Sequence, residues 1–173
     1  MNILIRKLNQ SDNTVIAQAS IHESWPKPLS LFENYFHEQE KSERAVWVAL
    51  VDDQYAGYVT LHWHSLYQPF ALNNIPEIVD LNVFPSFRNK GIGSQLLAAA
   101  EQEASLKSES VGLGVGLYGG PDGGYGPAQQ FYIKRGYIPD GNGITSKGTP
   151  LSYGESFILN DDLILWFTKN LSS

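Results

Sequence analysis

A glycine-containing segment is the part of this sequence whose residue types and spacing most clearly indicate chemistry. Arg88, Gly91 and Gly93 form the pattern Arg-x-x-Gly-x-Gly between a strand-like stretch, 77–84, and a segment with helical spacing of apolar residues. Glycines let backbone N–H groups approach a ligand closely, and the positive end of a helix dipole favours an anion. With Lys90 adding charge, the segment predicts a cradle for a pyrophosphate, and a tight turn with solvated cations is the alternative.

A second pattern lies at a short helix further along the chain. Pro127 suits the first turn of this helix, Lys134 and Arg135 suit its last turn, and Gly136 suits a left-handed cap. The first pattern therefore lies at the start of a predicted helix, and the second includes the end of another.

Together the two patterns resemble the GNAT superfamily of N-acetyltransferases, in particular its small single-domain bacterial members. The superfamily signature is Gln/Arg-x-x-Gly-x-Gly/Ala between the fourth strand and the following helix, and Arg88, Gly91 and Gly93 match it. A second superfamily pattern, Asn-x-x-Ala-x-x-x-Tyr-x-x-x-Gly-Phe, is approximated at four positions: Ala128, Tyr132, Gly136 and Tyr137. Tyr125 stands where the superfamily often has Asn.

The resemblance implies acetyl-CoA as co-substrate and direct transfer of its acetyl group to an amine. It places the cofactor against the end of the fourth strand, the glycine segment and one residue of the later helix: Leu81, Asn82, Val83, Arg88, Asn89, Lys90, Gly91, Ile92, Gly93, Ser94 and Ala128. It also implies that a backbone N–H near a bulge, around 81–83, stabilises the developing oxyanion.

Three side chains are candidates for proton transfer. An alkylammonium with a pKa near 10 is only about one part in a thousand neutral at pH 7, so a base helps to expose the lone pair. Glu77 stands where several superfamily members carry that base. Asp80 or ordered water could replace it, although strand alternation sends Asp80 to the opposite face unless a bulge intervenes. Tyr132 matches the tyrosine that protonates the departing thiolate in the superfamily. Their structural alternatives are a solvated carboxylate for Glu77 and a core aromatic for Tyr132.

The surrounding segments predict a sheet flanked by helices. Strand-like stretches occur at 3–8, 45–51, 55–66, 77–84, 111–117, 156–159 and 163–168. These stretches and the helices between them predict an α+β GNAT fold, with a mixed, mostly antiparallel sheet of about seven strands and helices on both faces. The resemblance places acetyl-CoA in a cleft between the fourth and fifth strands.

Apolar spacing also predicts which helix faces are buried. Ser11 or Asp12 caps a first helix with three apolar positions, Val15, Ile16 and Ala19. Ser30 and Glu33 have capping-box spacing for a second helix that runs toward Lys41. The helix after the glycine segment should bury five residues: Ile92, Leu96, Leu97, Ala100 and Ala104.

Two further patterns are weaker. His62 and His64 share a strand face, but no third ligand has suitable spacing, so we expect no metal. Gly112, Gly114 and Gly116 leave one strand face bare, where the cofactor or a helix could pack closely.

Length and composition restrict the number of domains, the partners and the mechanism that the chain can have. The 173 residues favour one domain, 1–173, and the net charge of −6 argues against nucleic acid as a partner. No apolar stretch approaches the roughly 18 residues of a membrane span, and the N-terminus lacks signal-peptide features, so we expect a cytoplasmic protein without a membrane partner. The absence of cysteine excludes an acyl-cysteine mechanism.

The sequence leaves several functional alternatives open. The preferred one is an acetyl-CoA-dependent N-acetyltransferase that acts on a small-molecule amine. A protein N-terminus or lysine is an alternative acceptor, and a noncatalytic CoA-binding sensor or scaffold is an alternative function. A homodimer is compatible with the sequence.

Overall fold

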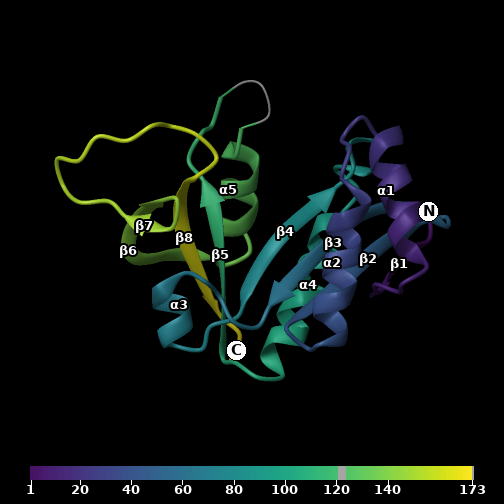
Figure 1. The fold of residues 1–173 in the computed structure, drawn as a ribbon, viewed down its shortest axis with the longest axis horizontal. Helices are drawn as coiled ribbons and strands as arrows, with labels where there is room; N and C mark the ends of the chain where they lie inside the picture. Colours follow the sequence, from purple (N-terminus) through teal and green to yellow (C-terminus); the bar gives the residue numbers. More distant parts are fainter. Residues whose placement is uncertain (121–123, 173) are drawn as a thin grey trace. The chain divides into compact units, whose positions relative to one another are not determined.

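The computed structural model describes residues 1–120 and 124–172. The chain forms two compact units, which are described separately (Figure 1). The first unit comprises Met1–Trp63 and Ile78–Lys107, and the second comprises His64–Glu77 and Ser108–Ser173.

The first unit contains one group of antiparallel strands and most of the helices. Its elements are β1 (Ile3–Lys7), α1 (Asp12–His22), α2 (Leu29–Glu40), β2 (Arg44–Val51), β3 (Gln54–His62), all but the first residue of β4 (Glu77–Val83), the 3-10 helix η1 (Pro85–Phe87) and α4 (Ile92–Ser105). The strands lie in the order β1-β2-β3-β4, and β2 pairs antiparallel with both β1 and β3. The β2–β3 hairpin turns through Asp52 and Asp53, whose φ angles of 47° and 64° are those of a primed turn.

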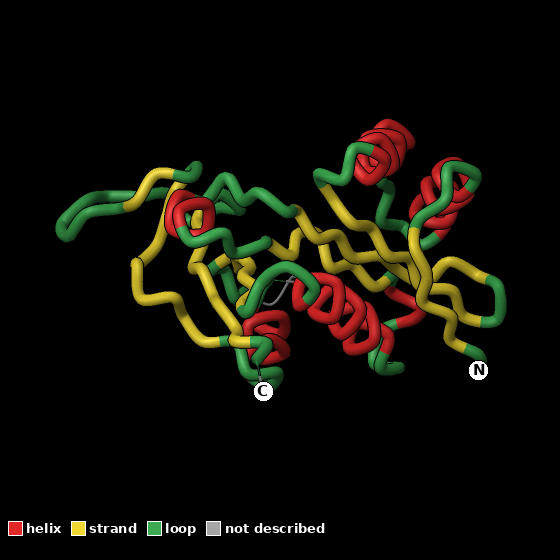
Figure 2. The backbone as a smooth tube through the Cα atoms, turned by 90° about the horizontal axis from the view of Figure 1, so that it is seen from below, coloured by secondary structure: helices red, strands yellow, loops and turns green. Residues whose placement is uncertain are grey.

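Helices cover both faces of these strands. Helix α2 packs against β2, and α4 packs against β2 and β3. Figure 2 shows helices on either side of the strands of this unit. The five apolar residues predicted for the face of α4 are all buried, which confirms that prediction.

Helix α1 differs from the prediction. Of its three predicted apolar positions only Ile16 is buried, whereas Val15 is exposed and Ala19 is partly buried. The helix instead buries the polar residues Asp12, Asn13 and Ser20. Ser20 donates a hydrogen bond to the Ala17 carbonyl, and Asp12 accepts hydrogen bonds from Arg6. The capping predictions are also wrong, because neither α1 nor α2 has a side-chain cap, and α2 begins directly after Pro28.

The second unit is built on a second group of strands. Its elements are α3 (Gln68–Leu72), β5 (Ser110–Gly116), α5 (Gly126–Ile133), β6 (Ile138–Ser146), β7 (Thr149–Pro150) and β8 (Leu163–Asn170). The strands lie in the order β5-β8-β6-β7, and each neighbouring pair is antiparallel. The α+β class and the mostly antiparallel pairing are confirmed, with eight strands among the described residues where about seven were expected.

The cap of α5 has the geometry that its sequence predicts. Gly136 has φ +87°, its N–H donates to the Ile133 carbonyl, and the Tyr137 N–H donates to the Tyr132 carbonyl. This pair of bonds is the Schellman motif, which requires a left-handed residue and favours glycine.

Three segments contradict the predicted strands and helices. The predicted strand 55–66 ends at His62, and the short helix α3 follows it. The apolar run 156–159 is exposed and forms no strand. Strand β6, which was not predicted, pairs with β8 instead, and the pairing is irregular between Pro139 and Ile144.

Aromatic rings fill the bare face of β5. A Cβ built on Gly112 would lie 2.2 Å from the Phe70 ring, and one built on Gly116 would lie 2.3 Å from the Tyr125 ring. Side chains at these positions are excluded because the rings already occupy the space.

Candidate functional site

The loop between β4 and α4 has the backbone geometry that close approach of an anion requires. Gly91 is the N-cap residue of α4 and has φ +78°, a conformation that favours glycine. A Cβ built on it meets no atom within 4 Å, so the space beside it is open. The first N–H groups of an α-helix have no acceptor within the helix. This end of α4 therefore presents backbone donors beside an open space.

The cationic side chains of this loop are held in place by neighbouring groups. Arg88 donates from Nε to the Val83 carbonyl at 3.1 Å, and Lys90 donates from Nζ to the Ser86 carbonyl at 2.8 Å. The Arg88 guanidinium carbon also lies 5.0 Å from the ring centroid of Trp25, in the connection between α1 and α2. Both predicted cations are thus ordered by hydrogen bonds to backbone carbonyls, Arg88 to the end of β4 and Lys90 to η1.

Strand β4 is irregular at Asp80. This residue has φ +56°, which regular strands do not adopt. The irregularity directly precedes Leu81, Asn82 and Val83, which are partly buried. Strand alternation was expected to place Asp80 on the face opposite Glu77 unless a bulge interrupted the strand.

The Asp80 carboxylate accepts a hydrogen bond from the Tyr35 hydroxyl on α2. Burial, followed by the negative charge of Asp80, raises the pKa of both Tyr35 and the neighbouring Tyr58. Tyr35 therefore stays protonated at neutral pH and remains a donor to Asp80.

Glu77 is held within the second unit. Its Oε2 accepts a hydrogen bond from Ser65 Oγ, and Ser65 Oγ accepts one from the Tyr67 N–H at 3.0 Å. Ser65 is buried and Glu77 is partly buried. Sequence reasoning missed Ser65 because it assigned the residue to a strand, and no local pattern links it to Glu77.

The remaining predicted residues, Ala128 and Tyr132, lie on α5 and are partly buried. The Tyr132 ring makes edge contacts with Phe131 and Tyr137, at centroid distances of 5.3 and 5.7 Å. Tyr132 is therefore packed against aromatic neighbours on one side without being a fully buried core residue.

The structure thus places the predicted site residues in two sets. The first unit holds Asp80 together with 81–83 and 88–94, and the second unit holds Glu77, Ala128 and Tyr132. Hydrogen bonds order Arg88, Lys90 and Asp80 in the first set and Glu77 in the second, and ring contacts order Tyr132.

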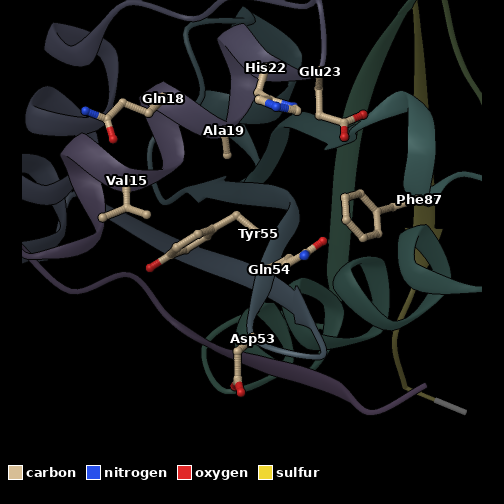
Figure 3. Close-up of a pocket in the computed structure, with 9 residues that line it drawn as sticks. All are labelled: Val15, Gln18, Ala19, His22, Glu23, Asp53, Gln54, Tyr55 and Phe87. Atoms are coloured by element: carbon tan, nitrogen blue, oxygen red, sulfur yellow. The ribbon is translucent and has the colours of Figure 1, made fainter.

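A pocket of about 430 Å³ lies elsewhere in the first unit (Figure 3). Its lining comes from α1 and its C-cap, the β2–β3 turn, the start of β3 and η1: Val15, Gln18, Ala19, His22, Glu23, Asp53, Gln54, Tyr55 and Phe87. None of the predicted site residues belongs to it. This pocket was not predicted, because Val15 and Ala19 were expected to be buried.

The described residues contain neither a candidate metal site nor a candidate membrane-spanning helix. No group of three or more His, Cys, Asp or Glu side chains there is placed to hold a metal ion, and this includes His62 and His64. No helix in that part of the chain is long and apolar enough to cross a membrane.

A protein-family model matches more than half of the chain. The family model for the acetyltransferase (GNAT) domain matches residues 42–139, which include β4, the glycine loop, α4 and α5. A search of curated proteins finds no match.

Solved structures with the same fold cover nearly the whole chain. An N-acetyltransferase from Staphylococcus aureus Mu50 is 18% identical, with a TM-score of 0.69 and coverage of 99% of this chain and 100% of that chain. The PaiA N-acetyltransferase of Thermoplasma acidophilum, in complex with coenzyme A, is 17% identical, with a TM-score of 0.64 and coverage of 98% and 99%. The yncA protein of Salmonella typhimurium, with its cofactor acetyl-CoA, is 14% identical, with a TM-score of 0.70 and coverage of 100% and 96%.

Proposed function

The chain belongs to the GNAT acetyltransferase family, and from this premise we propose that it transfers the acetyl group of acetyl-CoA to the amine of a small molecule. The observation that carries the proposal is the loop at Gly91, whose left-handed backbone and open surroundings suit a bound phosphate group. Two solved structures of the same fold contain coenzyme A or acetyl-CoA, which supports the same cofactor here.

The proposed cofactor site uses the loop and the adjoining strand. Backbone N–H groups of 91–94 would bind the pyrophosphate, and Arg88 and Lys90 would supply positive charge. A backbone N–H in 81–83 would donate a hydrogen bond to the acetyl oxygen, and Ala128 would contact the cofactor from α5. Bound acetyl-CoA supplies the activated acetyl group.

The proposed proton transfers use one carboxylate and one phenol. Glu77 would accept a proton from the amine, since an ammonium group has no lone pair for attack. We assign this role to Glu77 over Asp80 because Glu77 is partly buried, whereas Asp80 is exposed. Tyr132 would donate a proton to the departing thiolate.

The acceptor is proposed to be cationic before it loses its proton. The net charge of −6 raises the local concentration of cations near the protein, so polyamines are the first amines to screen. Neutral amino acids and short peptides with a free N-terminus or lysine form the comparison set.

The test is a screen for CoA release with a thiol reagent. The chain contains no cysteine, so a thiol signal reports only the cofactor product. We expect amine-dependent release, and about a hundredfold or greater loss at neutral pH in Glu77→Gln, with partial recovery as the pH rises. Asp80→Asn is the control and should lose far less.

The outcomes separate the candidate functions. Release with peptides alone would make a protein the acceptor. Binding of CoA without release from any amine would favour a noncatalytic module, and the absence of CoA binding would overturn the proposal.

A further inference from the structure

Ser65 is a buried polar residue that the proposed mechanism does not yet use. It lies between β3 and α3, and its side chain is 5% exposed. Its hydroxyl takes part in two hydrogen bonds, one with the Tyr67 N–H and one with the Glu77 carboxylate. The second bond joins residues separated by 12 positions and by all of α3.

The direction of the bond to Glu77 is fixed by the bond to Tyr67. A backbone N–H can only donate, so Ser65 Oγ is the acceptor in its bond with Tyr67. The single hydroxyl proton is then available for Glu77 Oε2. An ionised carboxylate can only accept, so this arrangement matches a charged Glu77.

Tyr67 is itself held on several sides, which keeps its N–H in place. Its ring stacks on Trp166 with 4.0 Å between centroids and 4° between planes. Its hydroxyl donates to Asp140 at 2.8 Å, and its ring meets the edge of Phe70 at 4.9 Å. Ser65 therefore receives its hydrogen bond from a rigid part of the second unit.

We propose that Ser65 is a positioning residue for the general base: it orients the Glu77 carboxylate and holds it in the charged form that accepts a proton. The inference rests on the proposed function, which assigns Glu77 as the base. A donated hydrogen bond favours the charged form of a carboxylate, so loss of the donor shifts its ionisation to higher pH.

The test compares Ser65→Ala with wild type across pH. At each pH, the ratio of variant to wild-type activity cancels the ionisation of the amine, which is the same for both proteins. We expect the ratio to be lowest at low pH and to approach one at high pH, with a midpoint shifted by about one pH unit. Ser65→Thr, which keeps the hydroxyl, should restore the wild-type profile.

Ser20 provides a matched control for the removal of a buried serine. It is 0% exposed, accepts a hydrogen bond from the Lys27 N–H at 2.8 Å and donates to the Ala17 carbonyl at 2.7 Å. Its hydrogen bonds thus resemble those of Ser65, except that no carboxylate is involved. We expect Ser20→Ala to lose stability without a pH-dependent change in activity.

NMR titration of the Glu77 carboxylate, identified by its loss in Glu77→Gln, tests the inference independently of turnover. A higher titration midpoint in Ser65→Ala supports it, even if wild type proves inactive and the proposed function fails. An unchanged midpoint, or an activity ratio that is constant across pH, would overturn it and leave Ser65 with a structural role alone.

Discussion

The guanidinium of Arg88 lies over the indole ring of Trp25, with 5.0 Å between its central carbon and the ring centroid. The Nζ of Lys27 lies 4.9 Å from the same centroid. Two positive charges near one ring repel each other, and a bound anion would relieve that repulsion. Trp25 thus orders two cations, one of which belongs to the predicted phosphate loop.

The first prediction is that Trp25→Leu weakens CoA binding by about three- to tenfold, as expected for the loss of one or two partly exposed cation–π contacts. Titration calorimetry gives the dissociation constant. In an Arg88→Ala background the same substitution should have a smaller effect, because one of its partners is already absent.

A second tryptophan provides the control for this experiment. Lys107 Nζ lies 4.1 Å from the ring centroid of Trp63, so this ring also carries a cation, but it is outside the phosphate loop. Trp63→Leu should leave CoA affinity unchanged. Additive effects of Trp25→Leu and Arg88→Ala would show that the ring does not position Arg88.

The second prediction compares two glycines with the same backbone conformation. Gly91 and Gly148 have φ angles of +78° and +77°, and a Cβ on either meets no atom within 4 Å. Alanine at each should cost about 1 kcal/mol of stability through backbone strain. Only Gly91→Ala should lose the rise in melting temperature that CoA gives wild type, because only that Cβ would enter the proposed phosphate site. An equal response in both variants would place the cofactor elsewhere.

The parts of the fold that sequence reasoning predicted depend on local spacing. The buried face of α4 follows from apolar residues at helical intervals within one 14-residue segment. The left-handed residue at Gly136 follows from the geometry of a helix C-terminus. The helix after the glycine segment and the cap of α5 were therefore predictable, since neighbouring residues encode them.

The parts that were missed depend on partners far along the chain. Strand β6 contains Pro139, Gly141 and Gly143, which do not indicate a strand, and it is defined by pairing with β8. The run 156–159 has strand-like composition but no strand partner. Ser65 has its proposed role because it donates a hydrogen bond to Glu77. In the sequence these two residues are separated by α3, a helix that was not predicted. Strand propensity reports a favourable environment more than an intrinsic preference, so such pairings are not readable locally.

The third prediction concerns the close contact between Gly112 and Phe70. A Cβ on Gly112 would lie 2.2 Å from a ring atom of Phe70, so Gly112→Ala should destabilise the protein by about 1–3 kcal/mol through overpacking. Adding Phe70→Leu should recover part of that loss, and urea denaturation measures both variants. Gly119→Ala, where the Cβ meets no atom within 4 Å, is the control. Strictly additive losses for Gly112 and Phe70 would contradict the steric account.

The fourth prediction concerns stability at low pH. Burial raises the pKa of Asp12, but hydrogen bonds from Arg6, Tyr55 and the Asn9 N–H outweigh burial, and the net effect lowers it. A folded-state pKa below the unfolded value of about 3.9 gives stability that is present above that pH. It is lost as the pH falls through the folded-state pKa.

Asp12→Asn tests this assignment. Urea denaturation between about pH 3 and pH 7 should show a smaller decline toward acid in the variant than in wild type, together with lower stability at neutral pH. If the free energy of unfolding declined equally toward acid in the variant and in wild type, other carboxylates would be the cause of that decline.

At alkaline pH, burial followed by the hydrogen bond to Asp12 raises the pKa of Tyr55 to about 12. Stability from the neutral phenol is therefore present below about pH 10 and lost as the pH rises toward 12.

The fifth prediction is that Tyr132→Phe lowers turnover more than it weakens acetyl-CoA binding. The substitution keeps the aromatic ring, so the contacts with Phe131 and Tyr137 should survive. The helix cap should also survive, because the Tyr137 N–H donates to the backbone carbonyl of residue 132. What is lost is a hydroxyl that, in the proposed mechanism, acts as the thiolate leaves.

Steady-state and single-turnover kinetics should therefore show kcat reduced by about a hundredfold or more, as expected for the loss of a general acid, with little change in the dissociation constant of acetyl-CoA. Tyr137→Phe removes a hydroxyl from the neighbouring ring and is the matched control, since no role in proton transfer is proposed for it. Equal effects of the two substitutions would indicate that both act through packing of α5. Unchanged single-turnover rates in Tyr132→Phe would remove this hydroxyl from the mechanism, and the departing thiolate would then have to be protonated by water or by another side chain.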